Sequence, residues 1–441
     1  MRCSFSTGRS AVRNLACLVA GLVLAPLAAA QPLTGWYDHI EYNREGDHYG
    51  TDRSQNLVDG KSHGDFLAPY DNRLDHWSWQ WRTYLEAIAA NDQKVYLHIP
   101  RHYIPDKNSL SEGDRTKIRL FVKHANGLPG VRGYIVWDEP RVGEKRSVGV
   151  LEDVYDVIKY NSSKPALLTM TLGTFQNGGV NDYKNACDRW IFDRYPLTEN
   201  GSEFENLGSF LASHLAADKY AREKGLQAHV ALQAYSAELF SNGNLRTPTF
   251  KEFRYMLWAS KCAYPWQDRF LYAHHFAKPA VVNLVEDAMD TMKMYDIYNR
   301  RVASFYPRVT PSSLSGDAAA AYARADGIKG IKVETVADDA GDGNVYVTML
   351  KHKSQNKYLV IGIKRAFDNQ EVRIKFRWDN FGQGKKARRI DLSRNGNGSL
   401  GPAIDLIQEG NSGQYFLPDN RFNNSKKHNF GDYEVRAWIV Q

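Results

Sequence analysis

The sequence predicts an α/β domain, a (β/α)₈ TIM barrel, followed by a C-terminal antiparallel β-sandwich. Short apolar runs alternate with helical segments through residues 31–310, and this alternation is typical of a parallel sheet. From about Gly327 onward the helical period is absent, and short strands separated by Asn, Gly and Asp turns replace it. A chain of 441 residues exceeds one ordinary core. We therefore expect two domains, residues 31–310 and 327–441.

The expected barrel strands are short apolar runs, most of which end in polar residues. They span residues 33–40, 65–70, 94–100, 134–137, 165–171, 189–196, 228–235 and 269–275. Helical spacing predicts helices over 77–88, 117–125, 150–158, 207–224 and 281–305, and a further helix that starts at Thr247-Pro248. In the sandwich we expect strands over 345–350, 358–363, 372–376 and 435–440.

Residues 1–30 have the three parts of an export signal. Arg2, Arg9 and Arg13 precede an apolar stretch, and Ala28-Ala29-Ala30 offers a small-residue cleavage site. We therefore expect a secreted or periplasmic protein, cleaved near Ala30/Gln31. No later stretch is apolar enough to cross a membrane.

Charge and cysteine usage exclude some partners. Three of the seven net positive charges lie in the signal, which leaves +4, and there is no dense basic run. Nucleic acid is therefore not an expected partner. Cys187 and Cys262 remain after cleavage. Export would permit a disulfide between them, and the sequence leaves this open.

The sequence Trp137-Asp138-Glu139-Pro140 follows the fourth expected strand. We expect the proline to end this strand and to hold Glu139 in an extended conformation. Acids at the carboxyl end of a parallel strand lie where α/β enzymes carry their chemistry. Adjacent carboxylates also raise the pKa of one member, and we expect that member to be Glu139.

The polar residues that end the other strands should share one pocket with this pair. The candidates for binding are Asp38, His98, Arg101, Trp137, Tyr195, Gln233, Tyr235 and His274, and those for catalysis are Glu139, Asp138 and Asp193. Acids, amides and aromatic rings suit a carbohydrate, whose hydroxyl groups need paired donors and acceptors. We expect no cofactor, and no metal, because the adjacent His274 and His275 point to opposite faces of a strand.

Cleavage of an O-glycosidic bond in a poly- or oligosaccharide needs an acid and a second group that meets the oxocarbenium-like centre. We expect Glu139 to be the acid, with Asp138 or Asp193 as its partner. The Asp-Glu-Pro motif, the Asp193-Arg194-Tyr195-Pro196 stretch and the trailing sandwich resemble the clan of secreted (β/α)₈ glycoside hydrolases whose fourth strand ends in Asn-Glu-Pro or Asp-Glu-Pro. The adjacent acids also resemble glycoside hydrolase families 20 and 123, which use substrate assistance.

In one respect the sequence departs from the Asn-Glu-Pro clan. The clan's nucleophile is a glutamate at the end of strand seven, where this chain has Gln233. Two mechanisms therefore stay open: Asp138 could orient a substrate acetamido group, or Asp193 could act from across the pocket. A non-catalytic carbohydrate-binding barrel, or a deacetylase or lyase on the same scaffold, are the alternative functions.

Export makes a prediction about the mature chain. Signal removal should leave Gln31 as the first residue, because Ala28-Ala29-Ala30 supplies the small side chains that the cleavage site requires. Mass spectrometry of protein recovered from the periplasm or medium should give this terminus. An intact Met1 in that fraction would contradict the prediction.

Overall fold

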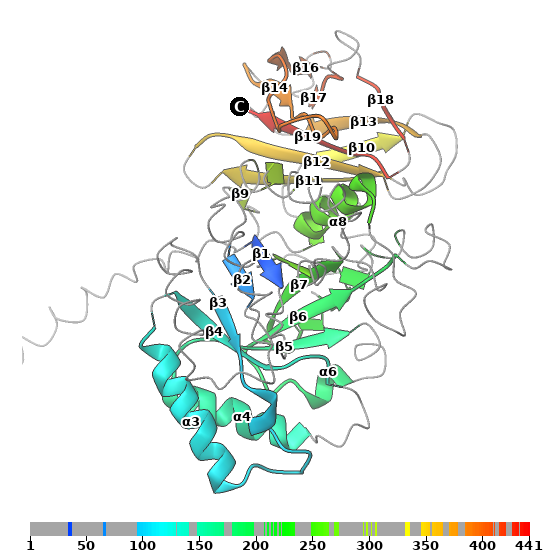
Figure 1. Cartoon of the computed structure of the whole chain (residues 1–441). Coiled ribbons are helices and arrows are strands. Elements are labelled where there is room, and N and C mark those ends of the chain that lie inside the picture. Colours follow the sequence, from blue (N-terminus) through cyan, green and yellow to red (C-terminus); the bar gives the residue numbers. More distant parts are fainter. Residues whose placement is uncertain are drawn as a thin grey trace, which may run out of the picture.

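The structure is a computed structural model of the whole chain (Figure 1). It describes residues 34–37, 65–67, 95–140 without 129, 148–171, 179–197, 224–233, 248–263, 269–272, 305–306 and most of 331–441. Single helical positions are also described between 207 and 223 and between 294 and 301. The expected export signal and the expected helix over 77–88 lie outside the described residues.

The N-terminal part contains a sheet of parallel strands. They are β1 Thr34–Tyr37, β2 Asp65–Leu67, β3 Val95–His98, β4 Val131–Trp137, β5 Ala166–Thr171, β6 Arg189–Arg194, β7 Gln227–Gln233 and β8 Arg269–Tyr272. Neighbours in sequence are neighbours in the sheet, and β1 also pairs with β8. The described helices between them are η1 Arg101–Tyr103, α3 Glu112–Asn126, α4 Val148–Asn161, α6 Gly179–Asp182 and α8 Phe250–Ala263.

Local chemistry fixes where two of these helices begin. The Ser111 side chain accepts a hydrogen bond from the backbone N–H of Asp114 and so caps α3. At α8 the Thr249 hydroxyl accepts from the Glu252 N–H, while the Glu252 carboxylate accepts from the Thr249 N–H. This reciprocal capping box starts the helix at Phe250, so the expected start at Thr247-Pro248 was wrong by two residues.

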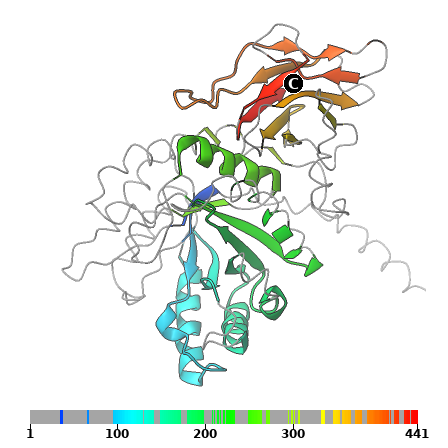
Figure 2. The same cartoon turned by 90° about the vertical axis from the view of Figure 1, so that its right-hand side faces the viewer.

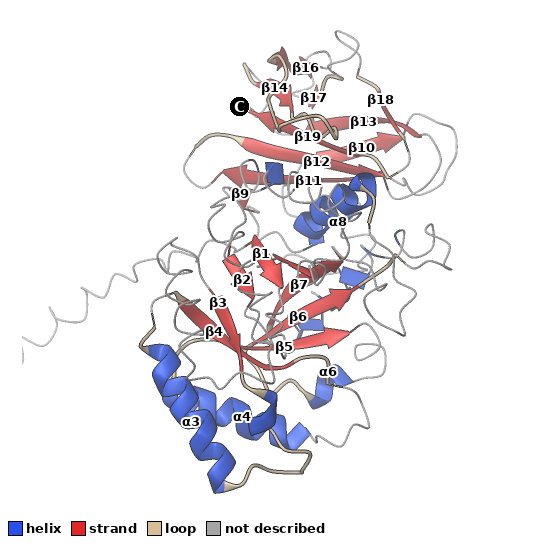
Figure 3. Cartoon of the chain, viewed as in Figure 1, coloured by secondary structure: helices blue, strands red, loops and turns tan. Residues whose placement is uncertain are grey.

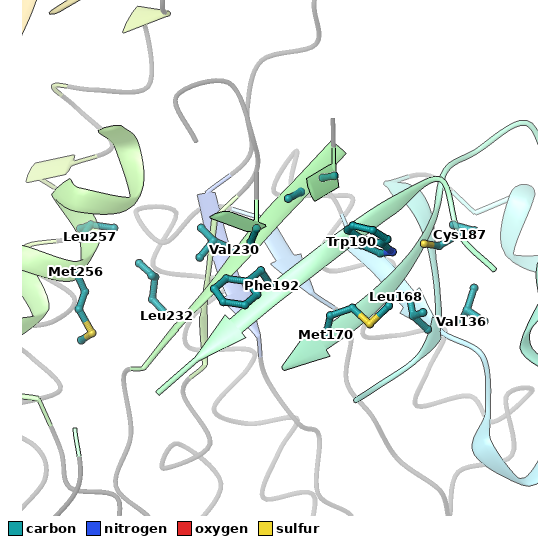
Figure 4. Close-up of a cluster of buried hydrophobic side chains, with 14 of the residues drawn as sticks. Val136, Leu168, Met170, Cys187, Trp190, Phe192, Val230, Leu232, Met256 and Leu257 are labelled. Atoms are coloured by element: carbon teal, nitrogen blue, oxygen red, sulfur yellow. The ribbon is translucent and has the colours of Figure 1, made fainter. Parts of the chain in front are cut away.

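Side chains alternate between the two faces of the parallel strands. One set forms a small cluster inside the sheet: Tyr96, Ile135, Leu167, Ile191 and Ala231. Their neighbours point outward and join a larger cluster with the helices, including Trp190, Phe192 and Leu232 (Figure 4). Strands β3 to β7 are buried on both faces, which explains why their sequences are continuous apolar runs.

Two antiparallel sheets make up the C-terminal part (Figure 3). The five-stranded sheet contains β10 Ile331–Thr335, β13 Gln370–Arg377, β17 Gln414–Phe416, β16 Ile407–Gln408 and β18 His428–Phe430. The six-stranded sheet has the order β15 Ile404–Asp405, β14 Lys386–Arg389, β19 Val435–Val440, β12 Tyr358–Lys364, β11 Val345–His352 and β9 Phe305–Tyr306.

Strand β9 corrects one expectation. The helix expected over 281–305 does not reach its predicted end, because Phe305 and Tyr306 are extended and pair with His352 and Lys351 of β11. Phe305 is the last residue of the helix that the sequence predicts, and Tyr306 follows it. Pairing with an open sheet edge overrides that local preference.

The six-stranded sheet is a middle layer (Figure 2). Alternate residues of β12 point to opposite sides: Leu359 and Ile361 join the cluster that contains α8, whereas Val360 joins the cluster between the two sheets. Tyr255 of α8 packs edge-on against Tyr433, with ring centroids 5.2 Å apart. The N-terminal part and the sandwich therefore share one continuous hydrophobic cluster.

The α/β class, with a parallel sheet and a C-terminal β-sandwich, is confirmed. The domain boundaries stay a prediction. Cys187 is a free, buried cysteine, so the structure contains no disulfide at this residue. Within the described residues, no helix is both long and apolar enough to cross a membrane.

Three buried histidines make stability depend on pH. Burial lowers the pKa of His98 and His428 to about 4 and that of His214 to about 3. Each is neutral in the folded protein, and His428 also faces Arg436 and Arg389, which lower its pKa further. The unfolded chain binds these protons near pH 6.5. Below that pH it therefore binds more protons than the folded chain, so stability falls with pH.

The prediction is that the free energy of unfolding declines between about pH 6.5 and pH 4. Replacing His428 by Gln, which can still donate to the Leu417 carbonyl, should flatten this decline by on the order of 2–3 kcal/mol. Urea unfolding at several pH values measures it. The exposed His102 provides the control, and a His102→Gln variant with the same effect would contradict the assignment.

Candidate active site

The two-residue period of the strands carries polar side chains into the carboxyl end of the sheet. The inward residues Tyr96, Leu167, Ile191 and Ala231 are followed two positions later, on the same face, by His98, Thr169, Asp193 and Gln233. All four are buried. The interior therefore changes from an apolar layer to a polar layer toward the end of the sheet where the chemistry of α/β barrels lies.

Asp193 is the most perturbed acid of this layer. It is 3% exposed, and burial raises its pKa well above the usual range. The charge of Glu139, a hydrogen bond between the two carboxyl groups, and the charge of Asp138 raise that pKa further. The structure thus brings the strand-four motif and the strand-six acid together, and the carboxyl group that keeps its proton is that of Asp193.

The Asp193 carboxyl group has one further polar contact and one open oxygen. The Tyr195 hydroxyl lies 3.4 Å from Oδ2 and donates to it. The other oxygen, Oδ1, is buried without a hydrogen-bond partner among the described residues. An unsatisfied buried oxygen is costly for a structural carboxyl group and common at functional sites.

Glu139 corrects the expectation of an extended backbone. Its φ is 49°, in the left-handed region that non-glycine residues seldom adopt. The strand just before it is irregular: the register between β4 and β5 shifts between Ile135 and Trp137. A bulge of this kind turns the following side chains. The preference of a residue before proline for an extended backbone reflects only the steric effect of the proline. It does not include the effect of a register shift in the preceding strand, so the prediction for Glu139 was wrong.

Arg101 lies over the neighbouring tryptophan and beside Asp138. Its guanidinium carbon is 4.7 Å from the centroid of the Trp137 ring, and Nη2 is 3.7 Å from Asp138 Oδ2. Trp137 itself is 4% exposed. The ring expected as a sugar platform is therefore stacked by Arg101, and Arg101 contributes a positive charge next to the acids.

His98 is a neutral member of the group. Burial lowers its pKa to about 4, although the charge of Asp138 acts in the opposite direction. At neutral pH its ring therefore offers one N–H donor and one acceptor nitrogen. The charged groups at the site are then Arg101 and the carboxylates of strand four.

The Gln233 side chain forms hydrogen bonds with the protein backbone. Its Nε2 donates to the Leu197 carbonyl at 3.0 Å, and its Oε1 accepts from the Leu197 N–H at 2.9 Å. Both residues are fully buried. Gln233 thus ties the end of β7 to the segment that follows Asp193 and Tyr195. An acid could not replace it, because a carboxylate cannot donate to the carbonyl.

The expected site residues fall into two groups, apart from Gln233, which binds the Leu197 backbone. The structure gathers Glu139, Asp138, Asp193, His98, Arg101, Trp137 and Tyr195 around the strand-four motif. Asp38, Tyr235 and His274 lie outside the described residues. Thr169 was missed: its buried hydroxyl has no hydrogen-bond partner among the described residues. The alternation within residues 166–171 could have revealed it, since it is polar at an inward position.

No group of three or more metal-ligating side chains occurs within the described part of the chain. The acids Asp193 and Glu139 form a pair, and the contact with Glu139 raises the pKa of Asp193. Such a pair can donate a proton to a leaving oxygen while its partner meets positive charge.

The fold resembles several solved glycoside hydrolases. A family 27 β-L-arabinopyranosidase from Geobacillus stearothermophilus has a TM-score of 0.52 and 9% identity, with 94% of this chain and 97% of that chain covered. A family 51 arabinofuranosidase from Xanthomonas axonopodis pv. citri gives 0.51 and 8%, covering 94% and 96%. A β-galactosidase from Rahnella sp. R3 gives 0.50 and 9%, covering 92% and 98%.

At these identities the likeness concerns the fold alone. No protein-family model matches the sequence, and no curated protein matches it. The matches nevertheless extend over more than nine tenths of this chain and of each of the two arabinosidases.

The Gln233 contact makes a prediction about stability. Replacing Gln233 by Leu leaves the Leu197 N–H and carbonyl buried without partners, so the free energy of unfolding should drop by roughly 2–4 kcal/mol. Urea unfolding measures the drop. Gln227→Leu, at the exposed start of the same strand, is the matched control and should change stability by less than about 0.5 kcal/mol. Equal stability of both variants would show that Gln233 does not hold this segment.

Proposed function

We propose that this protein is an exported glycoside hydrolase with a complete (β/α)₈ barrel, which cleaves O-glycosidic bonds in a poly- or oligosaccharide. The observation that carries the proposal is the buried Asp193 carboxyl group, with its raised pKa, beside Glu139 at the carboxyl end of the sheet. Strongly perturbed acids in contact with a second acid are typical of acid–base catalysis. The fold shared with glycoside hydrolases supports the same class.

In this proposal Asp193 is the general acid and Glu139 is its partner. The sequence favoured Glu139 as the acid, but burial and the nearby Glu139 raise the pKa of Asp193, which makes Asp193 the better candidate for the proton donor. Asp193 donates this proton to the glycosidic oxygen as the bond to the anomeric carbon breaks. The Glu139 carboxylate meets the positive charge that develops on the sugar, and one water completes the hydrolysis.

The two carboxyl groups share a hydrogen bond, which is closer than the roughly 5 Å between acid and nucleophile in retaining enzymes. A sugar bound between them would separate them by rotation of the Glu139 side chain. Before substrate binds, contact between the two carboxyl groups keeps the proton between them. When the sugar separates them, Asp193 can donate that proton to the leaving oxygen.

Asp138 and its neighbours supply the electrostatic setting. The guanidinium group of Arg101 lies 3.7 Å from the Asp138 carboxyl group and forms an ion pair with it. The Asp138 charge in turn raises the pKa of Asp193. We expect His98, which is neutral at this pH, and Tyr195, whose hydroxyl donates to Asp193, to contact sugar hydroxyl groups when a substrate binds.

The test begins with a panel of glycans and aryl glycosides. On the substrate found, Asp193→Asn and Glu139→Gln should each reduce kcat by about 10²–10⁴-fold, the range for a positioned acid–base group. The exposed Asp182 gives a matched control, Asp182→Asn, which should keep full activity. Mass analysis should find one added water per cleaved bond.

Asp138→Asn provides a second readout. Activity falls as pH rises through the pKa of the acid, because Asp193 must be protonated to donate. Removing the Asp138 charge lowers that pKa, so the basic limb of the pH–rate profile should move to lower pH. If the basic limb of the Asp138→Asn profile is unchanged, Asp138 does not influence the pKa of the catalytic acid. Binding without hydrolysis across the panel would favour a carbohydrate-binding barrel, and products without added water would favour a lyase.

A further inference from the structure

Thr169 is a member of the buried polar layer to which the proposed mechanism gives no role. It lies on β5 and is 1% exposed. Its Oγ1 has no hydrogen-bond partner among the described residues. A buried hydroxyl group without a partner costs free energy that a valine of similar shape would not cost. The hydroxyl group therefore does not stabilise the free protein, and another reason for its presence is needed.

The register places Thr169 between the strands that carry the two acids. Strand β5 lies between β4 and β6 in the sheet. On one side Trp137, two residues before Glu139, pairs with the residue that precedes Thr169. On the other side Thr171 pairs with Asp193, and Thr169 is the previous residue on the same face. The contact between Glu139 and Asp193 therefore spans β5, and Thr169 lies on the interior face between them.

The open oxygen of Thr169 has a neighbour of the same kind. Asp193 Oδ1 is also buried without a hydrogen-bond partner among the described residues. Thr169 pairs with Ile191, two residues before Asp193 on the same face, so the two open oxygens belong to diagonal neighbours. Diagonal neighbours on one face of a sheet are close enough for one ligand to contact both. Two open oxygens on one face suit a ligand with polar atoms on adjacent carbons, as a sugar has.

The proposed mechanism identifies the part of the sugar that meets Thr169. Asp193 donates to the glycosidic oxygen, and Glu139 meets the anomeric carbon. The sugar unit that is cleaved therefore lies between the two acids, over β5. The anomeric carbon has two ring neighbours, the ring oxygen and C2. The ring oxygen gains positive charge in the transition state, so a hydroxyl donor would oppose the reaction there. The substituent at C2 is the group that Thr169 can bind.

Both open oxygens are covered in the free protein, and the mechanism supplies a movement that uncovers them. Asp193 is 3% exposed, and the Glu139 carboxyl group lies against it. The Glu139 side chain must rotate away to admit a sugar between the two acids. Because this contact spans β5, the same rotation exposes the interior face on which Thr169 lies.

We propose that Thr169 is a substrate-binding residue, whose hydroxyl group binds a free hydroxyl group at C2 of the sugar unit that is cleaved. The substrates are then glycosides of hexoses or pentoses with a free C2 hydroxyl group, and not of 2-acetamido sugars. The inference rests on the proposed function, because the position of the sugar follows from the roles of Asp193 and Glu139.

The surroundings of Thr169 and Asp138 favour a hydroxyl group over an acetamido group. An acetamido group needs an acceptor for its N–H and space for its methyl group. Leu167 and Ile191, which flank Thr169 on the interior face, are fully buried in the apolar layer. Asp138, the acid that would orient an acetamido group, forms an ion pair with Arg101. A mechanism with Asp193 as the acid therefore fits better than substrate assistance.

The first test measures stability and needs no substrate. Thr169→Val removes the hydroxyl group and keeps the shape, so Tm should stay equal or rise by up to roughly 4 °C. Ser162→Ala is the matched control, because the buried Ser162 hydroxyl donates to Asn126 Oδ1 at 2.8 Å and accepts from the Lys164 N–H at 3.1 Å. This control should lower Tm. A lower Tm for Thr169→Val than for the wild type would overturn the inference, since the hydroxyl group would then be structural.

The second test uses 4-nitrophenyl glycosides of glucose, galactose, xylose and arabinose. On the glycoside that is hydrolysed fastest, Thr169→Val should lower kcat/KM by about 10–100-fold, whereas Ser162→Ala should keep full activity. On the 2-deoxy counterpart of that glycoside, Thr169→Val and wild type should agree within about twofold, because the group that Thr169 binds is absent. Equal losses on both glycosides would overturn the inference.

The 2-acetamido counterparts of the same glycosides test the substrate class. Wild-type protein should hydrolyse them at least roughly tenfold more slowly than the parent glycosides. Faster hydrolysis of the 2-acetamido glycosides would overturn the inference and would still support a glycosidase.

If no glycoside is hydrolysed, the proposed function fails and a binding measurement tests the inference separately. Calorimetry with free glucose, galactose, xylose and arabinose should then detect binding that Thr169→Val weakens and Ser162→Ala does not. Absence of binding, or binding that Thr169→Val leaves unchanged, would overturn the inference as well.

Discussion

A carboxyl group buried beside a second carboxyl group is the constraint on which the site depends. Ionisation of Asp193 is unfavourable, because its carboxyl group is buried and lies near the charge of Glu139. The position of both groups must therefore be fixed by rigid elements, since a small displacement would change the sharing of the proton. Parallel pairing of β5, β6 and β7 provides that rigidity for Asp193, and the Gln233 contact holds the segment after it.

The acids that follow β4 are positioned in a different way. The backbone of Glu139 is strained, the register before it is irregular, and Asp138 forms an ion pair. The bulge before Trp137 and the left-handed backbone of Glu139 turn two adjacent acids in a direction that a regular strand would not allow. Arg101 then balances Asp138. The site thus joins a rigid acid on β6 to a strained acid after β4, and the difference in environment separates their roles.

The fold could be predicted from the sequence where the apolar character of a segment indicates that the segment is buried. Continuous apolar runs marked the parallel strands, since both faces of each are covered. The sequence indicated Asp138 or Asp193 as the partner of Glu139 but could not decide between them, because a contact between strand ends depends on register and bulges. Rules based on local sequence also failed where tertiary structure determined the backbone. The residue before a proline was expected to be extended, but Glu139 has a left-handed backbone, and the expected helix ended at Phe305, which lies in a strand.

The position of β19 has a consequence for how the chain reaches its folded state. This strand follows all the other described strands in the sequence, yet it lies in the interior of its sheet, between β12 and β14. Its Ala437 belongs to the cluster that covers α8. A chain that emerges N-terminus first cannot complete that cluster until β19 has emerged. Vectorial folding of the barrel must therefore end with an exposed apolar helix, which the last strand covers.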